Sequence, residues 1–237
     1  MLISLALCAQ EIEHVDMSVM YKWGLVNTEI AQASLVLEKA DAPKRHALMT
    51  VKTAPFFDVF YKMRENFQSW FMACDYRPVE FIRDTYQNGY TATNHYLYDW
   101  EAGVIRSEVA YNGQDLQQLD IPLQGMSFDL VTLTYYLRSI DWASMENGKV
   151  SVIPFAIDDT VFQVKVTYRG QERISVRKKG KFNALRFSCT VVAGALFEGD
   201  QEVQVWFSED DKHIPLAIMV PLKMGTMWAW LRNYTHE

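Results

Sequence analysis

The chain has 237 residues, of which 49% are hydrophobic and 14% aromatic, and its formal net charge is −6. This length and apolar content suffice for one domain with a large core, and single all-β domains commonly reach this size. The acidic balance argues against a partner such as nucleic acid or an anionic membrane, because both require a basic face.

The first residues, MLISLALCAQE, are similar to the end of a secretory leader, with an apolar run from Leu2 to Ala9 before polar Gln10 and Glu11. No Lys or Arg precedes this run, so an N-terminal strand or a buried tail is the alternative. We expect residues 1–10 to be the remnant of a signal peptide and residues 11–237 to form a single β-rich domain. No apolar run approaches the ~20 residues that a membrane-spanning helix needs, so we expect no integral membrane segment.

Most of the chain alternates between apolar and polar residues with the two-residue period of strands. Asn88-Gly89 and Asn112-Gly113 follow such runs, and Asn-Gly pairs favour hairpin turns because both residues accept positive φ. Between Phe56 and Met63 the apolar spacing lengthens, which favours a short helix or a turn-rich insertion near residues 56–63. We predict strands at about 15–21, 31–37, 47–53, 67–74, 79–87, 90–100, 104–111, 150–157, 161–169, 172–177, 183–192, 201–208, 213–220 and 225–231.

One segment, SFDLVTLTYYLRSIDW at 127–142, has helical spacing instead. It is apolar on nearly every side, so it is expected to be enclosed. Ser127 is placed to cap its first turn, and Asp129 within that turn suits the positive end of the helix dipole. We therefore predict a mainly β fold, an antiparallel meander forming a large open barrel, half-barrel or sandwich wrapped on one central helix at about 127–141.

Three segments in this order resemble a known family: YKWG at 21–24, the helix from Asp129 to Arg138, and the closing run from Val205 to Leu231. It is the domain-of-unknown-function family numbered 3108, uncharacterised exported proteins of Gram-negative bacteria. The resemblance implies an address in the periplasm or at the periphery of the outer membrane. It also implies a largely antiparallel β fold, similar to the half-barrel lipoprotein carriers of the LolA and LolB type. It supplies no catalytic residues.

Candidate catalytic and metal-binding residues do not form recognised patterns. The five histidines have no ligand spacing, so we expect no metal site and no cofactor. Glu209-Asp210-Asp211 suits a solvated turn better than a calcium loop. Cys74 and Cys189 are either one disulfide or two buried free thiols. The basic run at 177–181 is typical of a hairpin tip beside Gly180.

Arg138 is the charged residue of the helix with the clearest alternatives. A buried Arg138 paired with a strand carboxylate would orient the helix, whereas an unpaired one would form an anion site at the mouth of a cavity. Aromatic residues present a similar choice between core packing and a concave apolar pocket. The residues considered for such a pocket are Trp70, Tyr86, Tyr96, Tyr98, Trp100, Trp206, Trp228 and Trp230.

These patterns favour a non-enzymatic exported protein of the cell envelope that binds a hydrophobic or amphiphilic ligand, such as a lipid, an acyl chain or a glycan. The alternative is an envelope scaffold or assembly factor that contacts proteins through strand edges or an aromatic patch. A third is a hydrolase of envelope glycans, which would need two carboxylates facing a cleft.

Overall fold

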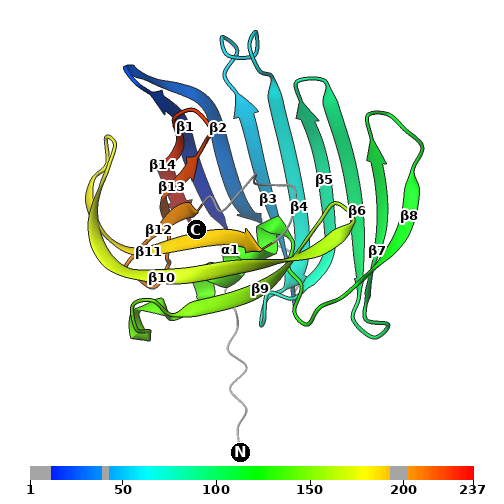
Figure 1. Cartoon of the computed structure of the whole chain (residues 1–237). Coiled ribbons are helices and arrows are strands. Elements are labelled where there is room, and N and C mark those ends of the chain that lie inside the picture. Colours follow the sequence, from blue (N-terminus) through cyan, green and yellow to red (C-terminus); the bar gives the residue numbers. More distant parts are fainter. Residues whose placement is uncertain (1–11, 39–42, 193–201) are drawn as a thin grey trace, which may run out of the picture.

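The computed structural model describes residues 12–38, 43–192 and 202–237, so the predicted signal-peptide remnant at 1–10 lies outside the described residues. Within them, one antiparallel sheet of fourteen strands has the order β8-β7-β6-β5-β4-β3-β2-β1-β14-β13-β12-β11-β10-β9. The sheet curls around α1 but stays open, with β8 and β9 at its two edges (Figure 1). The predicted mainly β fold around one helix is confirmed. The strands are β1 (Glu13–Trp23), β2 (Val26–Glu38), β3 (Lys44–Thr53), β4 (Met63–Met72), β5 (Pro78–Gln87), β6 (Tyr90–Asp99), β7 (Val104–Tyr111), β8 (Gln117–Pro122), β9 (Val150–Ile157), β10 (Thr160–Val176), β11 (Gly180–Val192), β12 (Val203–Ser208), β13 (Pro215–Pro221) and β14 (Thr226–His236).

The helix α1 (Leu130–Ser139) is enclosed, as its apolar circumference predicted, but its cap differs from the prediction. Asp129, not Ser127, is the N-cap: its carboxylate accepts hydrogen bonds from the backbone N–H groups of Val131 and Thr132 at 2.9 Å. The Thr132 hydroxyl closes a capping box by accepting from the Asp129 N–H. Among the described residues, no helix is both long and apolar enough to cross a bilayer.

The segment before α1 ties the two ends of the open sheet together. Phe128 forms a parallel bridge with Phe155 of β9, with backbone hydrogen bonds to Pro154 and from Ala156. The turn between β9 and β10 then reaches β5 and β6, because Asp158 pairs with Arg83 at 2.6 Å and its carbonyl accepts from the Tyr96 hydroxyl. The concave side of the sheet is therefore crossed by α1 and by this turn.

The structure corrects several local predictions. Of the two alternatives for residues 56–63, the turn-rich insertion is confirmed and the short helix is wrong. Residues 55–60 form turns, and Phe56, Val59 and Phe60 are exposed instead of forming the buried side of a helix. The predicted strands at 161–169 and 172–177 are the single strand β10, in which Gly170 (φ +87°) forms a bulge instead of a break. The strand β8 and the 3₁₀ turn η1 (Trp142–Ser144) were not predicted.

Strand register assigns the side chains to two faces. We call the face that carries α1 the inner face and the opposite one the outer face. Ser69 of β4 donates to the Asp129 carboxylate of α1 at 2.8 Å, which marks its row as inner. Residues paired across antiparallel strands share a face, so the row through Ser69 continues to Ala47, Leu37 and Glu13 on one side and to Phe81 and Tyr96 on the other.

Candidate functional site

The inner face beyond α1 carries half-buried apolar side chains from strands on both sides of β1. Ala33 pairs with Val51, and Met49, two residues before Val51 on β3, lies on the same face. Across β1, Ala229 pairs with Ile218 and Ile218 with Val205. These side chains keep part of their surface accessible, whereas the row nearer α1 is fully buried. We call this set the inner wall; it consists of Ala33, Met49, Val51, Val205, Ile218 and Ala229.

Next to the inner wall, the same face also carries polar side chains on β4 to β7. Glu65 lies directly opposite Val51, and its carboxylate accepts hydrogen bonds from Thr85 and Gln87 at 2.6 Å. Arg83 donates to the Thr85 hydroxyl at 2.8 Å and pairs with Asp158. These polar side chains, which we call the polar half of the inner face, lie among buried apolar side chains of the same strands, such as Phe67 and Phe81.

Three buried side chains on the inner face of β6 and β7 have polar atoms without a hydrogen-bond partner. They are the amide of Asn94 and the hydroxyls of Tyr98 and Ser107. Leaving such a group unpaired in the interior costs about 1–3 kcal/mol. Asn94 lies three strands from Met49 in the same row, or roughly 14 Å at the usual strand spacing of about 4.8 Å. The amide is only 1% exposed, so it lies beneath the surface of the inner face.

Arg138 resolves the two alternatives set by the sequence in favour of the structural one. Its guanidinium forms two hydrogen bonds with the Glu13 carboxylate, at 2.6 and 2.7 Å, and both side chains are about 93% buried from solvent, with exposures of 7% and 6%. It also donates to the backbone carbonyls of Lys212 and His213. Arg138 thus joins α1 to β1 and to the turn between β12 and β13.

A cavity of about 370 Å³ adjoins this ion pair and is lined by Arg45, Tyr76, Tyr135, Lys212 and Tyr234, among others. The hydroxyls of Tyr135 and Tyr234 are buried beside the Glu13 carboxylate. Burial, and then the nearby Glu13 charge, raise the pKa of Tyr135, and the same two causes raise the pKa of Tyr234 to about 12. Both phenols therefore stay neutral, as potential donors beside a pair of opposite charges.

The predicted aromatic residues do not line one concave pocket. Tyr96 and Tyr98 are buried on the inner face, where burial raises the pKa of each hydroxyl. Trp100 lies at the end of β6, and its indole N–H donates to the Pro78 carbonyl at 2.8 Å. Trp70 stacks on His46 on the outer face, and Tyr86 on the same face is partly exposed.

The remaining three tryptophans form a stack on the outer face. The ring centroids of Trp206 and Trp228 are 5.5 Å apart, and those of Trp228 and Trp230 are 4.8 Å apart and nearly parallel. They are even-numbered positions, opposite in direction to Val205 and Ala229 of the inner wall. The predicted single pocket fails because a strand presents neighbouring residues to opposite faces, so these tryptophans cannot share a face with the inner wall.

The distal part of the β10–β11 hairpin covers this stack. Val176 is fully buried against it, and the Trp206 indole N–H donates to Glu172. The basic run at the tip is a turn, as predicted, but it also lines a cavity of about 250 Å³ with Trp230 and Arg232. The tip lies close to β1, because Arg177 contacts the sulfur of Met20 at 3.4 Å.

Among the described residues, the cysteines and the acidic turn considered in the sequence analysis do not form a functional site. Cys74 and Cys189 are both free thiols, but Cys74 is exposed, so the prediction of two buried thiols is wrong for it; burial raises the pKa of Cys189 to about 12. Asp210 in the acidic turn accepts hydrogen bonds from Ser208 and the Lys212 N–H. Across the described ranges, no three His, Cys, Asp or Glu side chains gather as metal ligands.

The sequence did not reveal Glu13, Glu65, Arg83 or Asn94 as members of the inner face. Glu13 and Arg138 are 125 positions apart, and no local pattern connects them. A polar residue at an inward position of an alternating strand was the available signal for Arg83 and Asn94, since such a position normally carries an apolar side chain.

Comparison with known proteins gives a family and a fold. A family described as protein of unknown function (DUF3108) matches residues 17–229. A crystal structure of a beta-barrel-like protein of the domain of unknown function DUF1849 from Brucella abortus superposes with a TM-score of 0.60 at 11% identity, over 95% of this chain and 98% of that one. A hypothetical protein from Chlamydia trachomatis aligns over 94% of this chain and 87% of that one, with a TM-score of 0.38 and 7% identity. No curated protein matches the chain.

Proposed function

The chain belongs to the family of proteins of unknown function DUF3108, and on the geometry of its inner face we propose that it is a non-enzymatic binding protein for an amphiphilic ligand. The apolar part of the ligand, an acyl chain or a comparable hydrocarbon, lies against the inner wall. Its polar part lies at the border of the inner wall, beside Glu65 and the half-buried Gln87 that donates to it.

The observation that carries this proposal is the partial exposure of the inner wall. Side chains such as Val51 and Ala229 point to the concave side of the sheet, where core residues are normally covered, yet they retain accessible surface. Burying apolar surface yields about 25 cal/mol per Å², so an apolar ligand has a favourable place there. The adjacent polar half gives such a ligand an orientation.

The carboxylates of the inner face support binding over catalysis. Glu13 is held by Arg138, Glu65 by Thr85 and Gln87, and Asp158 by Arg83. A glycan hydrolase needs one carboxylic acid that donates a proton and one carboxylate that faces a cleft. Each of these groups instead accepts hydrogen bonds from neighbouring side chains, which suits a scaffold.

A titration with a fluorescent fatty acid tests the proposal, with native mass spectrometry of the purified protein as a second measurement. We expect saturable binding and a co-purifying mass in the range of a lipid. Ala33→Asp places a charge on the inner wall, where desolvating it costs several kcal/mol. This variant should bind at least about tenfold more weakly, since 1.4 kcal/mol is a factor of ten.

Gln32→Asp is the matched control, because Gln32 is the neighbouring residue on β2 and faces outward. It should bind as the wild type does. Denaturation midpoints of both variants show whether the fold is kept. Absence of saturable binding by the wild type, with no co-purifying mass, would contradict the proposal.

Export to the cell envelope forms part of the same proposal. It is supported by the apolar segment from Leu2 to Ala9 and by the proposed ligand class, since lipids and acyl chains abound in the envelope. Fractionation of cells that express the full chain tests it. The protein is expected in the periplasmic or outer-membrane fraction, and its recovery with a cytoplasmic marker would contradict this address.

A further inference from the structure

Three turns at one end of the sheet expose an unusual number of large apolar side chains. Leu25 in the β1–β2 turn is completely exposed, Val59 and Phe60 in the β3–β4 loop are 83% and 76% exposed, and Met224 in the β13–β14 turn is 62% exposed. Scattered exposed apolar residues are normal, but a contiguous patch marks an interaction surface. We call this patch the apolar rim; it consists of Trp23, Leu25, Val26, Phe56, Val59, Phe60, Tyr61, Leu222 and Met224.

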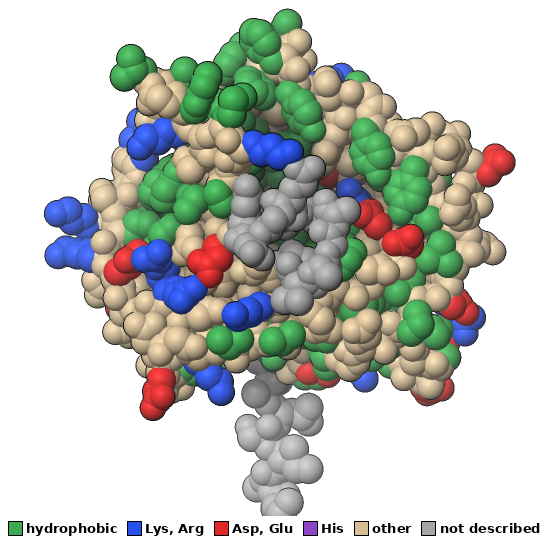
Figure 2. Space-filling model, in the orientation of Figure 1, with side chains coloured by type: hydrophobic (Ala, Val, Ile, Leu, Met, Phe, Trp, Pro, Cys, Tyr) green, Lys and Arg blue, Asp and Glu red, His purple; other side chains and the backbone are tan. Residues whose placement is uncertain are grey.

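The three turns are neighbours in space although they are distant in sequence. The order β4-β3-β2-β1-β14-β13 places them side by side. The Tyr21 hydroxyl donates to the Met224 carbonyl at 2.9 Å, and the Ala54 N–H donates to the Ile30 carbonyl at 2.8 Å. In Figure 2, hydrophobic side chains gather along the upper edge of the molecule, where Figure 1 places these turns.

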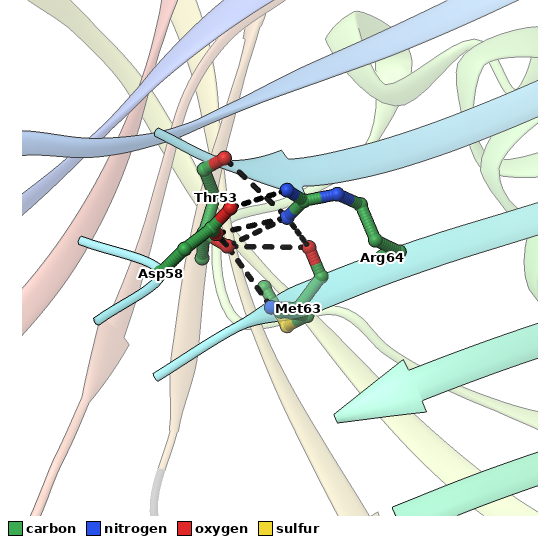
Figure 3. Close-up of polar contacts among 4 residues, drawn as sticks. All are labelled: Thr53, Asp58, Met63 and Arg64. Atoms are coloured by element: carbon green, nitrogen blue, oxygen red, sulfur yellow. Dashed lines mark hydrogen bonds and ion pairs between the residues drawn. The ribbon is translucent and has the colours of Figure 1, made fainter. Parts of the chain in front are cut away.

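The β3–β4 loop is braced so that its apolar side chains stay outside. Asp58 lies at the centre of the brace: it pairs with Arg64 at 2.5 Å and accepts a hydrogen bond from the Thr53 hydroxyl (Figure 3). The Thr53 hydroxyl oxygen in turn accepts from the Met63 N–H at 2.9 Å. The hydrogen bonds from Arg64 and Thr53 lower the pKa of Asp58 to about 2, so the brace is charged at any physiological pH.

We infer that the apolar rim docks the protein on the surface of a lipid bilayer. The rim is made of protruding turn tips instead of a groove, and a soft interface accommodates separate protrusions better than a rigid protein surface does. Aromatic and aliphatic side chains with flanking cations are the composition of interfacial anchors. The turn tips carry three cations, Lys22, Lys62 and Lys223. Their one anion, Asp58, is neutralised by its pairing with Arg64. This local positive balance contrasts with the net charge of −6 of the whole chain.

The apolar rim is continuous with the interior. Phe57 packs with Val19, Ile30 and Ala31 of the inner face, and its ring contacts those of Phe56 and Phe60 at 6.4 and 6.2 Å. A hydrocarbon chain leaving a bilayer at the rim thus meets apolar side chains toward the inner wall. Docking itself follows from the rim alone and does not depend on the proposed ligand.

Co-flotation of the full chain with lipid vesicles tests this inference. Vesicles of phosphatidylethanolamine and phosphatidylglycerol at 3:1 are the probe, with pure phosphatidylcholine for comparison. We expect the wild type to float with the mixed vesicles, and Leu25→Asp and Phe60→Asp each to lower the partition coefficient at least tenfold. Leu97→Asp is the matched control, because Leu97 is 46% exposed on the outer face away from the rim; it should float as the wild type does.

Charge reversal tests the contribution of the lysines. Lys22→Glu combined with Lys62→Glu should weaken flotation with the mixed vesicles severalfold, whereas Lys165→Glu, at an exposed position of β10, should not. A wild type that stays unbound to both vesicle types would overturn the inference. So would concentration-dependent dimers in light scattering that Phe60→Asp abolishes without any vesicle binding, since the rim would then join two copies of the chain.

The outcomes for docking and for ligand binding are separable. Ala33→Asp should keep flotation while it loses fatty-acid binding from solution. Leu25→Asp should lose flotation while it keeps fatty-acid binding. Loss of both properties in both variants, with unchanged denaturation midpoints, would contradict two separate surfaces.

Discussion

Breaking the ion pair between Arg138 and Glu13 should destabilise the protein severely. Both side chains are buried, and together they join α1, β1 and the turn after β12. Removing one partner of a buried pair typically costs about 3–5 kcal/mol, because the other charge stays buried without compensation. The unfolding free energy of a domain is only about 5–15 kcal/mol, so this cost is a large part of the total.

The substitutions Arg138→Met and Glu13→Met, alone and together, measure this cost. Each single variant should lose about 3–5 kcal/mol in guanidinium unfolding followed by tryptophan fluorescence, with an unchanged slope against denaturant. The double variant should lose less than either single one, since well-packed apolar residues often replace a buried pair at little cost.

Two results would refute this reasoning. A single variant that loses less than about 1 kcal/mol would show that the pair is not buried in solution. A double variant whose loss equals the sum of the two single losses would show that the residues are not coupled. Stable folding of Arg138→Met with abolished ligand binding would instead assign Arg138 to an anion site.

Three further predictions concern stability and reactivity. Burial raises the pKa of Asp129 from 3.8 to about 6, so the stability that the protonated carboxyl contributes is fully present below pH 3.8 and is lost as the pH rises through 6. The free energy of unfolding of Asp129→Asn should therefore rise by about 3 kcal/mol relative to that of the wild type between pH 4 and 7 in urea unfolding. Parallel pH profiles of the two proteins would contradict this. Gly225→Ala should lower the melting temperature, because φ is +82° and a Cβ would lie 2.3 Å from the Lys22 carbonyl oxygen; an unchanged melting temperature would show that the turn relaxes. Ellman's reagent at pH 8 should modify exposed Cys74 within minutes and buried Cys189 only on unfolding, and equal rates would contradict that burial.

Local signals in the sequence were enough for most of the sheet. Asn88-Gly89 and Asn112-Gly113 both have positive φ at the predicted turns, because only a few residue types tolerate that conformation. The central helix was evident from its spacing, but its first residue was not. Ser127 accepts a hydrogen bond from the Gln124 N–H instead of capping the helix, and both Ser and Asp are good caps.

Phe56, Val59 and Phe60 show why the apolar rim could not be predicted from the sequence. Apolar residues three and four apart normally mark the buried side of a helix, whereas here they are exposed tips of a braced loop. Their significance depends on Leu25 and Met224, which are distant in sequence and adjacent only through the strand order. Likewise, alternation puts Trp228 and Trp230 on one face of a strand but does not say which face holds the helix.

Photolabelling tests the central claim, that an amphiphile lies on the inner wall, most directly. The protein would be irradiated with a fatty acid that carries a diazirine near the end of its chain, and the modified residues would be identified by fragment mass spectrometry. We predict labels on inner-wall residues such as Ala33, Val51 and Ala229, and excess unlabelled fatty acid should reduce this labelling. Labels confined to outer-face residues such as Trp228 and Trp230, or labels that competition does not reduce, would contradict it.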